Sequence, residues 1–331
     1  MKILQYILIA LLITPFFAHA QIGIPLADTL EVILNPETPG SFEDIKAKIE
    51  SYSFDLSRSL VIWSVDGKEK LRGVGERNFT FRTGPTGKEV KLVISITTPE
   101  GEKFSKTTTI LPGEVDLVWE ADSYVPPFYL GKALPTSESD IRVVAIPNMV
   151  TKSGVKKQTS DLVYTWKVEN SVDRSISGYG KNSITVHNNI VRESVKVEVS
   201  VSSLDGTMSA INRITIPITQ SELHFYEERP LEGTRYEAVL DLGASLNQAE
   251  GSIRAEPYFV SASDYLGGLI ENLWSIAGDP ALPSPLSQWM ITLRKKADSF
   301  GEISISLESR NKKKLLQDAR ASFDLSYGKK Q

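Results

Sequence analysis

The sequence contains LVIWSVDG at residues 60–67, and two related stretches follow it, LVYTWKVE at 162–169 and LWSIAG at 273–278. Their tryptophans, Trp63, Trp166 and Trp274, are 103 and 108 residues apart. A period of this length matches a whole domain rather than the short unit of a solenoid. The repetition therefore predicts one module present in three tandem copies.

Apolar and polar residues alternate in a segment that begins about 30 residues after each tryptophan. These segments are 90–96, 195–201 and 303–307. Strict alternation predicts antiparallel strands with one buried face and one solvated face. Similar alternation predicts strands upstream of each tryptophan at 45–49, 141–145 and 253–255, and closing strands follow at 106–111, 212–216 and 321–327.

Turn signals separate these strands, as in TPEG at 98–101 and SLDG at 203–206. About seven short strands per copy, with a tryptophan on a middle strand, are typical of an immunoglobulin-like sandwich. The predicted fold is therefore all-β. It consists of three tandem immunoglobulin- or PKD-like antiparallel β-sandwiches, at 21–113, 114–220 and 221–331, and the short junctions between them predict a semi-rigid rod.

The third copy departs from the other two. Residues 263–273 read as partly helical or as an irregular insertion, and residues 278–285 read as a stiff proline-rich loop. Terminal copies of an array often diverge because one end has no neighbour.

The first twenty residues, MKILQYILIALLITPFFAHA, have the form of a secretory signal peptide. Lys2 supplies the positive charge, residues 3–17 are apolar, and Ala18 and Ala20 provide the small-x-small cleavage pattern. We predict cleavage between Ala20 and Gln21; an uncleaved N-terminal anchor is the alternative. Localisation is then extracellular, at the cell surface or in the periplasm, and how the protein is retained there stays open.

The WSVDG stretch at 63–67 and VSVSSLDG at 199–206 resemble PKD-type and related Ig-like modules of exported bacterial surface proteins. The tract at 118–132 is similar to a block in multi-domain surface proteins of candidate bacterial phyla. The resemblance implies an adhesive or spacer role without catalytic residues. The family's WDFGDG core motif is absent, and Asp66-Gly67 is what remains of it.

Residues for catalysis are scarce. The chain has no cysteine and three histidines, of which His187 and His224 follow the predicted cleavage site in different modules. No HExxH or GxSxG motif occurs, which argues against zinc hydrolases and Ser-His-Asp enzymes. We therefore expect no catalytic residues, no cofactor and no metal site.

Two weaker signals have simpler explanations. Gly73-Val-Gly75 and Gly178-Tyr-Gly180 precede predicted strands, where glycine supplies positive φ at turns or bulges rather than a dinucleotide site. Acidic residues cluster at turns (Asp66, Glu100, Asp205 and the Glu120/Asp122 pair), but no calcium loop motif accompanies them. Solvated turns are the favoured interpretation.

The candidate binding residues are aromatic. Trp119, Tyr124, Phe128 and Tyr129 flank two prolines near the first junction and would suit a glycan or a partner surface. The alternative, favoured because aromatics recur at 223–236, is that these rings fill the seam between the first and second modules.

The charge balance completes the functional hypothesis. Lys and Arg number 37 and Asp and Glu 41, so there is no basic excess to attract nucleic acid. The favoured function is a non-catalytic, exported cell-envelope or surface protein that acts as a spacer, scaffold or adhesion module, with a protein or glycan as partner. The alternatives are a carbohydrate-binding protein and an accessory domain of an exported hydrolase.

Overall fold

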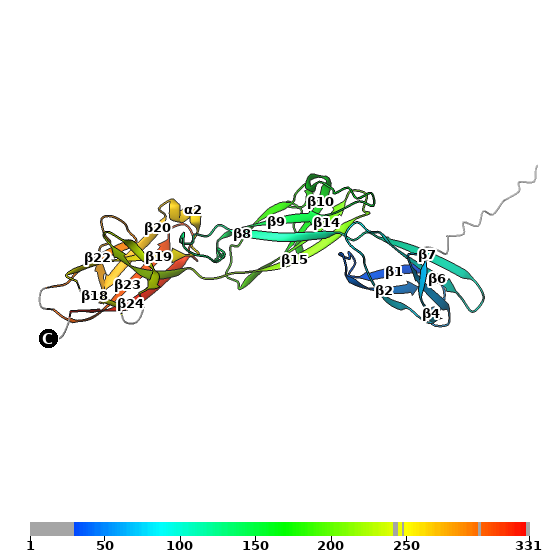
Figure 1. Cartoon of the computed structure of the whole chain (residues 1–331), viewed down its shortest axis with the longest axis horizontal. Helices are drawn as coiled ribbons and strands as arrows, with labels where there is room; N and C mark the ends of the chain where they lie inside the picture. Colours follow the sequence, from blue (N-terminus) through cyan, green and yellow to red (C-terminus); the bar gives the residue numbers. More distant parts are fainter. Residues whose placement is uncertain (1–29, 241–243, 247, 297–298, 329–331) are drawn as a thin grey trace, which may run out of the picture. The chain divides into compact units, whose positions relative to one another are not determined.

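The computed structural model describes residues 30–240, 244–246, 248–296 and 299–328. The predicted signal peptide and its cleavage site lie outside these residues. Nearly every described element is a β-strand, and the strands form six sheets that enclose three clusters of buried apolar side chains (Figure 1). The prediction of an all-β chain of tandem immunoglobulin-like sandwiches is confirmed.

The first sandwich has the sheet orders β1-β2-β5 and β4-β3-β6-β7. Its strands are β1 (Leu30–Asn35), β2 (Asp44–Ser51), β3 (Leu60–Val65), β4 (Lys68–Val74), β5 (Asn78–Arg82), β6 (Val90–Thr97) and β7 (Lys103–Ile110). Ile45, Ala47 and Ile49 of β2 are buried, as their alternation predicts. Asp66 and Gly67 both have positive φ and close the β3–β4 hairpin, a turn that requires such residues.

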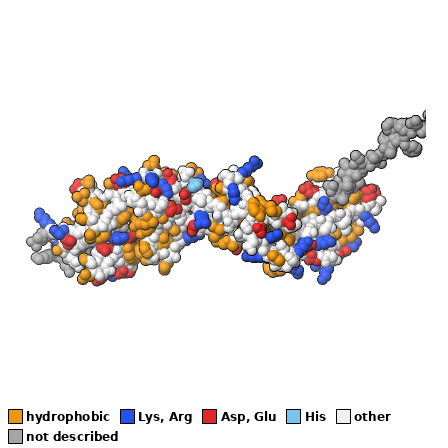
Figure 2. Space-filling model, turned by 90° about the horizontal axis from the view of Figure 1, so that it is seen from above, with side chains coloured by type: hydrophobic (Ala, Val, Ile, Leu, Met, Phe, Trp, Pro, Cys, Tyr) orange, Lys and Arg blue, Asp and Glu red, His pale blue; other side chains and the backbone are white. Residues whose placement is uncertain are grey.

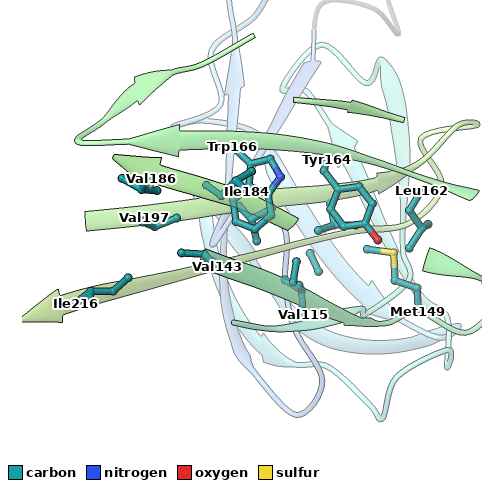
Figure 3. Close-up of a cluster of buried hydrophobic side chains, with 14 of the residues drawn as sticks. Val115, Val143, Met149, Leu162, Tyr164, Trp166, Ile184, Val186, Val197 and Ile216 are labelled. Atoms are coloured by element: carbon teal, nitrogen blue, oxygen red, sulfur yellow. The ribbon is translucent and has the colours of Figure 1, made fainter. Parts of the chain in front are cut away.

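The second sandwich repeats this order as β8-β9-β13 against β11-β10-β14-β15, with β12 also paired to β10. The elements are β8 (Glu114–Ala121), β9 (Asp140–Asn148), η2 (Thr159–Asp161), β10 (Leu162–Val168), β11 (Ser171–Val172), β12 (Gly178–Tyr179), β13 (Ser183–His187), β14 (Ser194–Ser203) and β15 (Ser209–Pro217). Val143 of β9 and Val197 of β14 come from the two opposed sheets and belong to the same core as Trp166 (Figure 3).

The third sandwich has the sheets β17-β16-β19-β22 and β18-β24-β23-β20-β21. The elements are β16 (Glu222–Arg229), β17 (Gly233–Val239), β18 (Ala244–Leu246), β19 (Glu250–Tyr258), α2 (Ala262–Leu266), β20 (Ile270–Ile276), β21 (Asp279–Ala281), β22 (Met290–Arg294), β23 (Gly301–Asn311) and β24 (Asp318–Tyr327). The short helix α2 agrees with the partly helical pattern. The prediction of a proline-rich loop over 278–285 is wrong at its start. Residues Asp279–Ala281 form the short strand β21, which pairs with β20.

The three tryptophans occupy equivalent places. Their exposed fractions are 0%, 0% and 2%, and each lies opposite an apolar residue of the neighbouring strand. The cross-strand pairs are Trp63 with Ile94, Trp166 with Val199 and Trp274 with Leu307. Each indole N–H donates to a backbone oxygen, those of Glu76, Lys181 and Gln288, at 2.9, 2.8 and 3.0 Å. The repeated stretch in the sequence therefore marks one repeated structural position.

The chain divides into two compact units, of which the first holds β1 to β7 and the second holds β8 to β24. The second unit thus contains two sandwiches and two separate apolar clusters. The predicted boundaries at 113/114 and 220/221 fall between β7 and β8 and between β15 and β16. These boundaries stay predictions, and so does the semi-rigid rod expected from the sequence.

Candidate functional site: a docking segment between two sandwiches

Residues 122–139 connect β8 to β9, and we call them the docking segment. They leave the second sandwich and bind the third, beside α2 in Figure 1. Two backbone hydrogen bonds fix the start of the segment: the Tyr124 N–H donates to Val260 O, and the Phe259 N–H donates to Tyr124 O, both at 2.7 Å. These bonds join one residue of the docking segment to two successive residues of the third sandwich, so the backbone links the two sandwiches as well as the side chains.

Three aromatic side chains of the docking segment contact aromatic side chains of the third sandwich. The Tyr124 ring stacks on Tyr265 with centroids 3.9 Å apart. The Phe128 ring stacks on Tyr236 at 4.0 Å. Tyr129 meets Tyr258 and Phe259 edge-on, at 5.7 and 5.8 Å. Aromatic pairs contribute about 0.5–1.5 kcal/mol each beyond the area that they bury. Together these contacts therefore stabilise the association of the second and third sandwiches substantially.

A buried ion pair lies under these rings. Glu256 is 1% exposed and accepts from Arg254 Nε at 2.5 Å and from the Tyr236 hydroxyl at 3.0 Å. The Tyr124 hydroxyl of the docking segment donates to the same carboxylate at 3.4 Å. A carboxylate out of water is tolerated only with such partners, so the seam and the ion pair depend on each other.

This environment shifts the pKa values of the tyrosines in the seam and of Arg254. Burial raises the pKa of Tyr124, Tyr236 and Tyr265 above the usual value, and the negative charge of Glu256 adds to the rise. Burial by itself lowers the pKa of Arg254, but the hydrogen bond and charge of Glu256 outweigh it and raise that pKa overall. The tyrosines are therefore held neutral and the guanidinium charged.

The far end of the docking segment is held by polar groups. Thr136 and Ser139 are 1% and 0% exposed, and Gln317 of the third sandwich is 1% exposed. Gln317 Nε2 donates to Ser137 O at 3.0 Å and to Ser139 Oγ at 3.2 Å. Thr136 Oγ1 donates to Phe259 O at 3.1 Å. Buried hydrogen bonds of this kind fix one relative placement, because a shift would leave polar groups unpaired.

The predicted seam was assigned to the wrong neighbour. Tyr124, Phe128 and Tyr129 pack on the third sandwich, whereas their position in the sequence, just after the first junction, predicted a seam with the first. The reason is the length of β8, because eight residues of extended chain advance about 26 Å. The strand carries the chain along the second sandwich before the docking segment begins. Of the aromatics that recur at 223–236, Tyr226 and Tyr236 contact Phe128 in this same seam, whereas Phe225 lies in the core of the third sandwich.

Trp119 has a different environment from the other three predicted residues. It lies on β8, packs against the core of the second sandwich, and has Lys132 Nζ 3.3 Å above its ring. Three of the four rings are thus covered on one face, Trp119 by Lys132, Tyr124 by Tyr265 and Phe128 by Tyr236. This arrangement supports the seam interpretation over an open glycan platform made of these four rings.

Sequence reasoning missed the residues that receive the docking segment. Tyr226, Glu256 and Tyr258 occupy outward positions of β16 and β19, where a solvated face carries polar residues, yet they are 2%, 1% and 7% exposed. The sequence does carry a signal for this surface. Tyr226 and Tyr258 stand on the face of their strands opposite to the core-facing Leu223, Phe225, Ile253 and Ala255. A strand with apolar residues on both faces indicates a second contact surface.

The acidic turn residues serve as local acceptors. Asp205 accepts hydrogen bonds from Ser203 and Thr207, which lower its pKa to about 2. Asp66 accepts from the Lys91 N–H at 2.9 Å. Within the described residues, no group of three or more His, Cys, Asp or Glu side chains is placed to hold a metal ion.

Basic and acidic side chains are interspersed over the face shown in Figure 2. His187 pairs with Asp140 at 2.7 Å, and His224 pairs with Glu222 at 3.3 Å. None of the helices in the described ranges is long and apolar enough to cross a membrane.

Comparison with known proteins gives likeness only to solved structures. No protein-family model matches the chain, and no curated protein matches it. Three domains of the highly immunogenic outer capsid protein of bacteriophage RB49 are 10% identical, with a TM-score of 0.27, covering 92% of this chain and 99% of that one. The central fibronectin-III array of RIM-binding protein is 11% identical, with a TM-score of 0.29, covering 91% and 96%.

A third similar structure is SGBP-B of the Bacteroides ovatus mixed-linkage glucan utilization locus, in complex with a mixed-linkage heptasaccharide. It is 12% identical with a TM-score of 0.22, covering 90% of this chain and 70% of that one. The fold assignment rests on the sheet order and strand register described above rather than on these scores.

Proposed function

We propose that the chain is an exported, non-catalytic protein of the cell envelope or cell surface, in which tandem sandwiches act as a spacer, scaffold or adhesion module. The proposal includes secretion through residues 1–20 and the relation to PKD-type modules of bacterial surface proteins. The observation that carries it is the docking segment. Its aromatic side chains are used to join one sandwich to the next, which is what a spacer of fixed length requires.

The seam supports a fixed link for a physical reason. A short linker limits the reorientation of two sandwiches, but without an interface few further contacts oppose the motion. Here the linker at 218–221 is accompanied by the docking segment, a buried ion pair and the polar contacts of Gln317. Reorientation would expose Glu256 and break several aromatic contacts at once.

A distance measurement tests the spacer proposal. The chain has no cysteine, so Glu120→Cys and Glu302→Cys give unique positions for spin labels on the second and third sandwiches. We expect a single narrow distance distribution by pulsed electron resonance, and a broader one when Phe128→Ala is added. A broad distribution in the otherwise wild-type chain would remove the basis of the spacer proposal.

The location and partner need separate tests. N-terminal sequencing of exported material should give a start at Gln21, and a start at Met1 in the membrane fraction would contradict cleavage. Cell-envelope material retained on the immobilised full chain, with no turnover of the retained polymer, is the result expected for an adhesion module. Release of cleaved product would instead indicate a hydrolase.

A further inference from the structure

A groove of about 440 Å³ lies beside the docking segment on the outer face of β16. Glu222, His224 and Tyr226, three successive outward residues of β16, form its floor. Tyr129 and Leu134 of the docking segment form one wall, and Tyr258 of β19 adjoins them. The groove therefore exists only because the docking segment is seated on the third sandwich.

We propose that this groove binds an uncharged oligosaccharide. Its lining combines the half-buried Tyr129 ring, which suits the apolar face of a sugar ring, with groups that can both donate and accept hydrogen bonds. The His224 and Glu222 side chains are 38% and 51% exposed, so both are available to sugar hydroxyls. The volume falls within the range of small-molecule sites.

The tyrosine hydroxyls at the floor add a directed donor. The Tyr226 and Tyr258 hydroxyls lie 2.9 Å apart, so one donates to the other. That bond uses one of their two hydrogens, and the hydroxyl that accepts it can donate its own hydrogen to a ligand oxygen in the groove.

Two features disfavour other ligands. None of the described residues that line the groove is Lys or Arg, while Glu222 contributes a carboxylate, so a polyanion gains no charge pairing there. β16 lies between β17 and β19 in its sheet, so its backbone offers no free edge to an extended peptide. An uncharged, hydroxyl-rich ring ligand fits the remaining chemistry.

The test uses the full chain and four probes: cellohexaose, xylohexaose, maltohexaose and the hexamer of N-acetylglucosamine. Affinity is measured by titration calorimetry, and the site is mapped by NMR shifts of groove residues. Val239→Trp fills the groove from the exposed end of β17 without removing a seam contact. His224→Ala removes one hydrogen-bonding group, and His187→Ala is its matched control, because His187 forms a similar exposed pair with Asp140 on the second sandwich.

At least one probe should bind, Val239→Trp should weaken it by at least about tenfold, and His224→Ala by about fivefold or more, with His187→Ala unchanged. The inference is wrong if no probe binds at millimolar concentration, if the probe shifts residues outside the groove, or if His187→Ala and His224→Ala weaken binding equally. The groove requires the seated docking segment, so this inference rests on the seam of the spacer proposal. The two can still fail separately: a narrow distance distribution without sugar binding overturns only the inference, whereas a broad distribution overturns the spacer proposal.

Discussion

β9 and β19 occupy the same place in the second and third sandwiches, yet their outward faces differ. Outward on β9, Arg142 is exposed and pairs with Glu120 at 3.6 Å, with side chains 60% and 71% exposed. Outward on β19, Arg254 and Glu256 pair at 2.5 Å with side chains 29% and 1% exposed. The fold requires one buried face per sheet, and a second buried face therefore marks a contact with another part of the protein.

Substitutions on the inner faces of the second and third sandwiches should have similar effects on stability. Trp166→Ala and Trp274→Ala each remove a buried indole and its hydrogen bond, so each should lower the free energy of unfolding of its own sandwich by about 3–5 kcal/mol. Chemical denaturation followed by circular dichroism measures both. A loss below about 1 kcal/mol at either site would show that the two tryptophans are not equivalent.

Removing the ion pairs on the outward faces of β19 and β9 should have different effects on stability. Glu256→Ala leaves Arg254 without its buried partner and should cost about 2–4 kcal/mol. Glu120→Ala, the matched change at the exposed pair, should cost no more than about 1 kcal/mol. Equal costs in denaturant titrations would mean that the outward face of β19 is not buried in solution.

The aromatic contacts test how far the second and third sandwiches unfold together. Phe128→Ala removes the ring stacked on Tyr236 and should weaken the seam by about 1–3 kcal/mol, so that calorimetry resolves separate transitions for the two sandwiches. Leu130→Ala is the control, because this residue of the same segment is 101% exposed. Identical thermograms for the two variants would contradict the seam.

The smallest expected effect is a pH dependence confined to the seam. Tyr124 and Tyr236 have raised pKa values in the folded chain, so the folded state keeps these protons after the unfolded state has lost them. Their contribution is complete below the unfolded pKa of about 10 and is lost as the pH rises toward the folded pKa. Melting temperatures between pH 8 and 11.5 should fall above pH 10, and a double change of Tyr124→Phe and Tyr236→Phe should flatten that fall. An unchanged slope would assign the alkaline loss to other groups.

The local patterns predicted most of the strands. Val195, Val197, Val199 and Val201 are all buried, as their alternation in the sequence indicates. The start of the proline-rich loop was misassigned because residues 279–281 pair with β20 despite Pro280, at the edge of the sheet where a missing N–H is tolerated. For the candidate site, the sequence draws attention to the aromatic residues at 124–129, but the sandwich that they contact could not be inferred from it.

The sequence by itself determined what depends on neighbouring residues: the strand alternation, the tryptophan that recurs in each copy, and the glycine turns. Only the tertiary structure decided which surfaces meet. Tyr124 and Tyr265 are far apart in the chain, and nothing within either segment specifies the other. A strand's periodicity tells which side is buried within its own sandwich, whereas contact between sandwiches depends on how far β8 carries the chain before the docking segment begins.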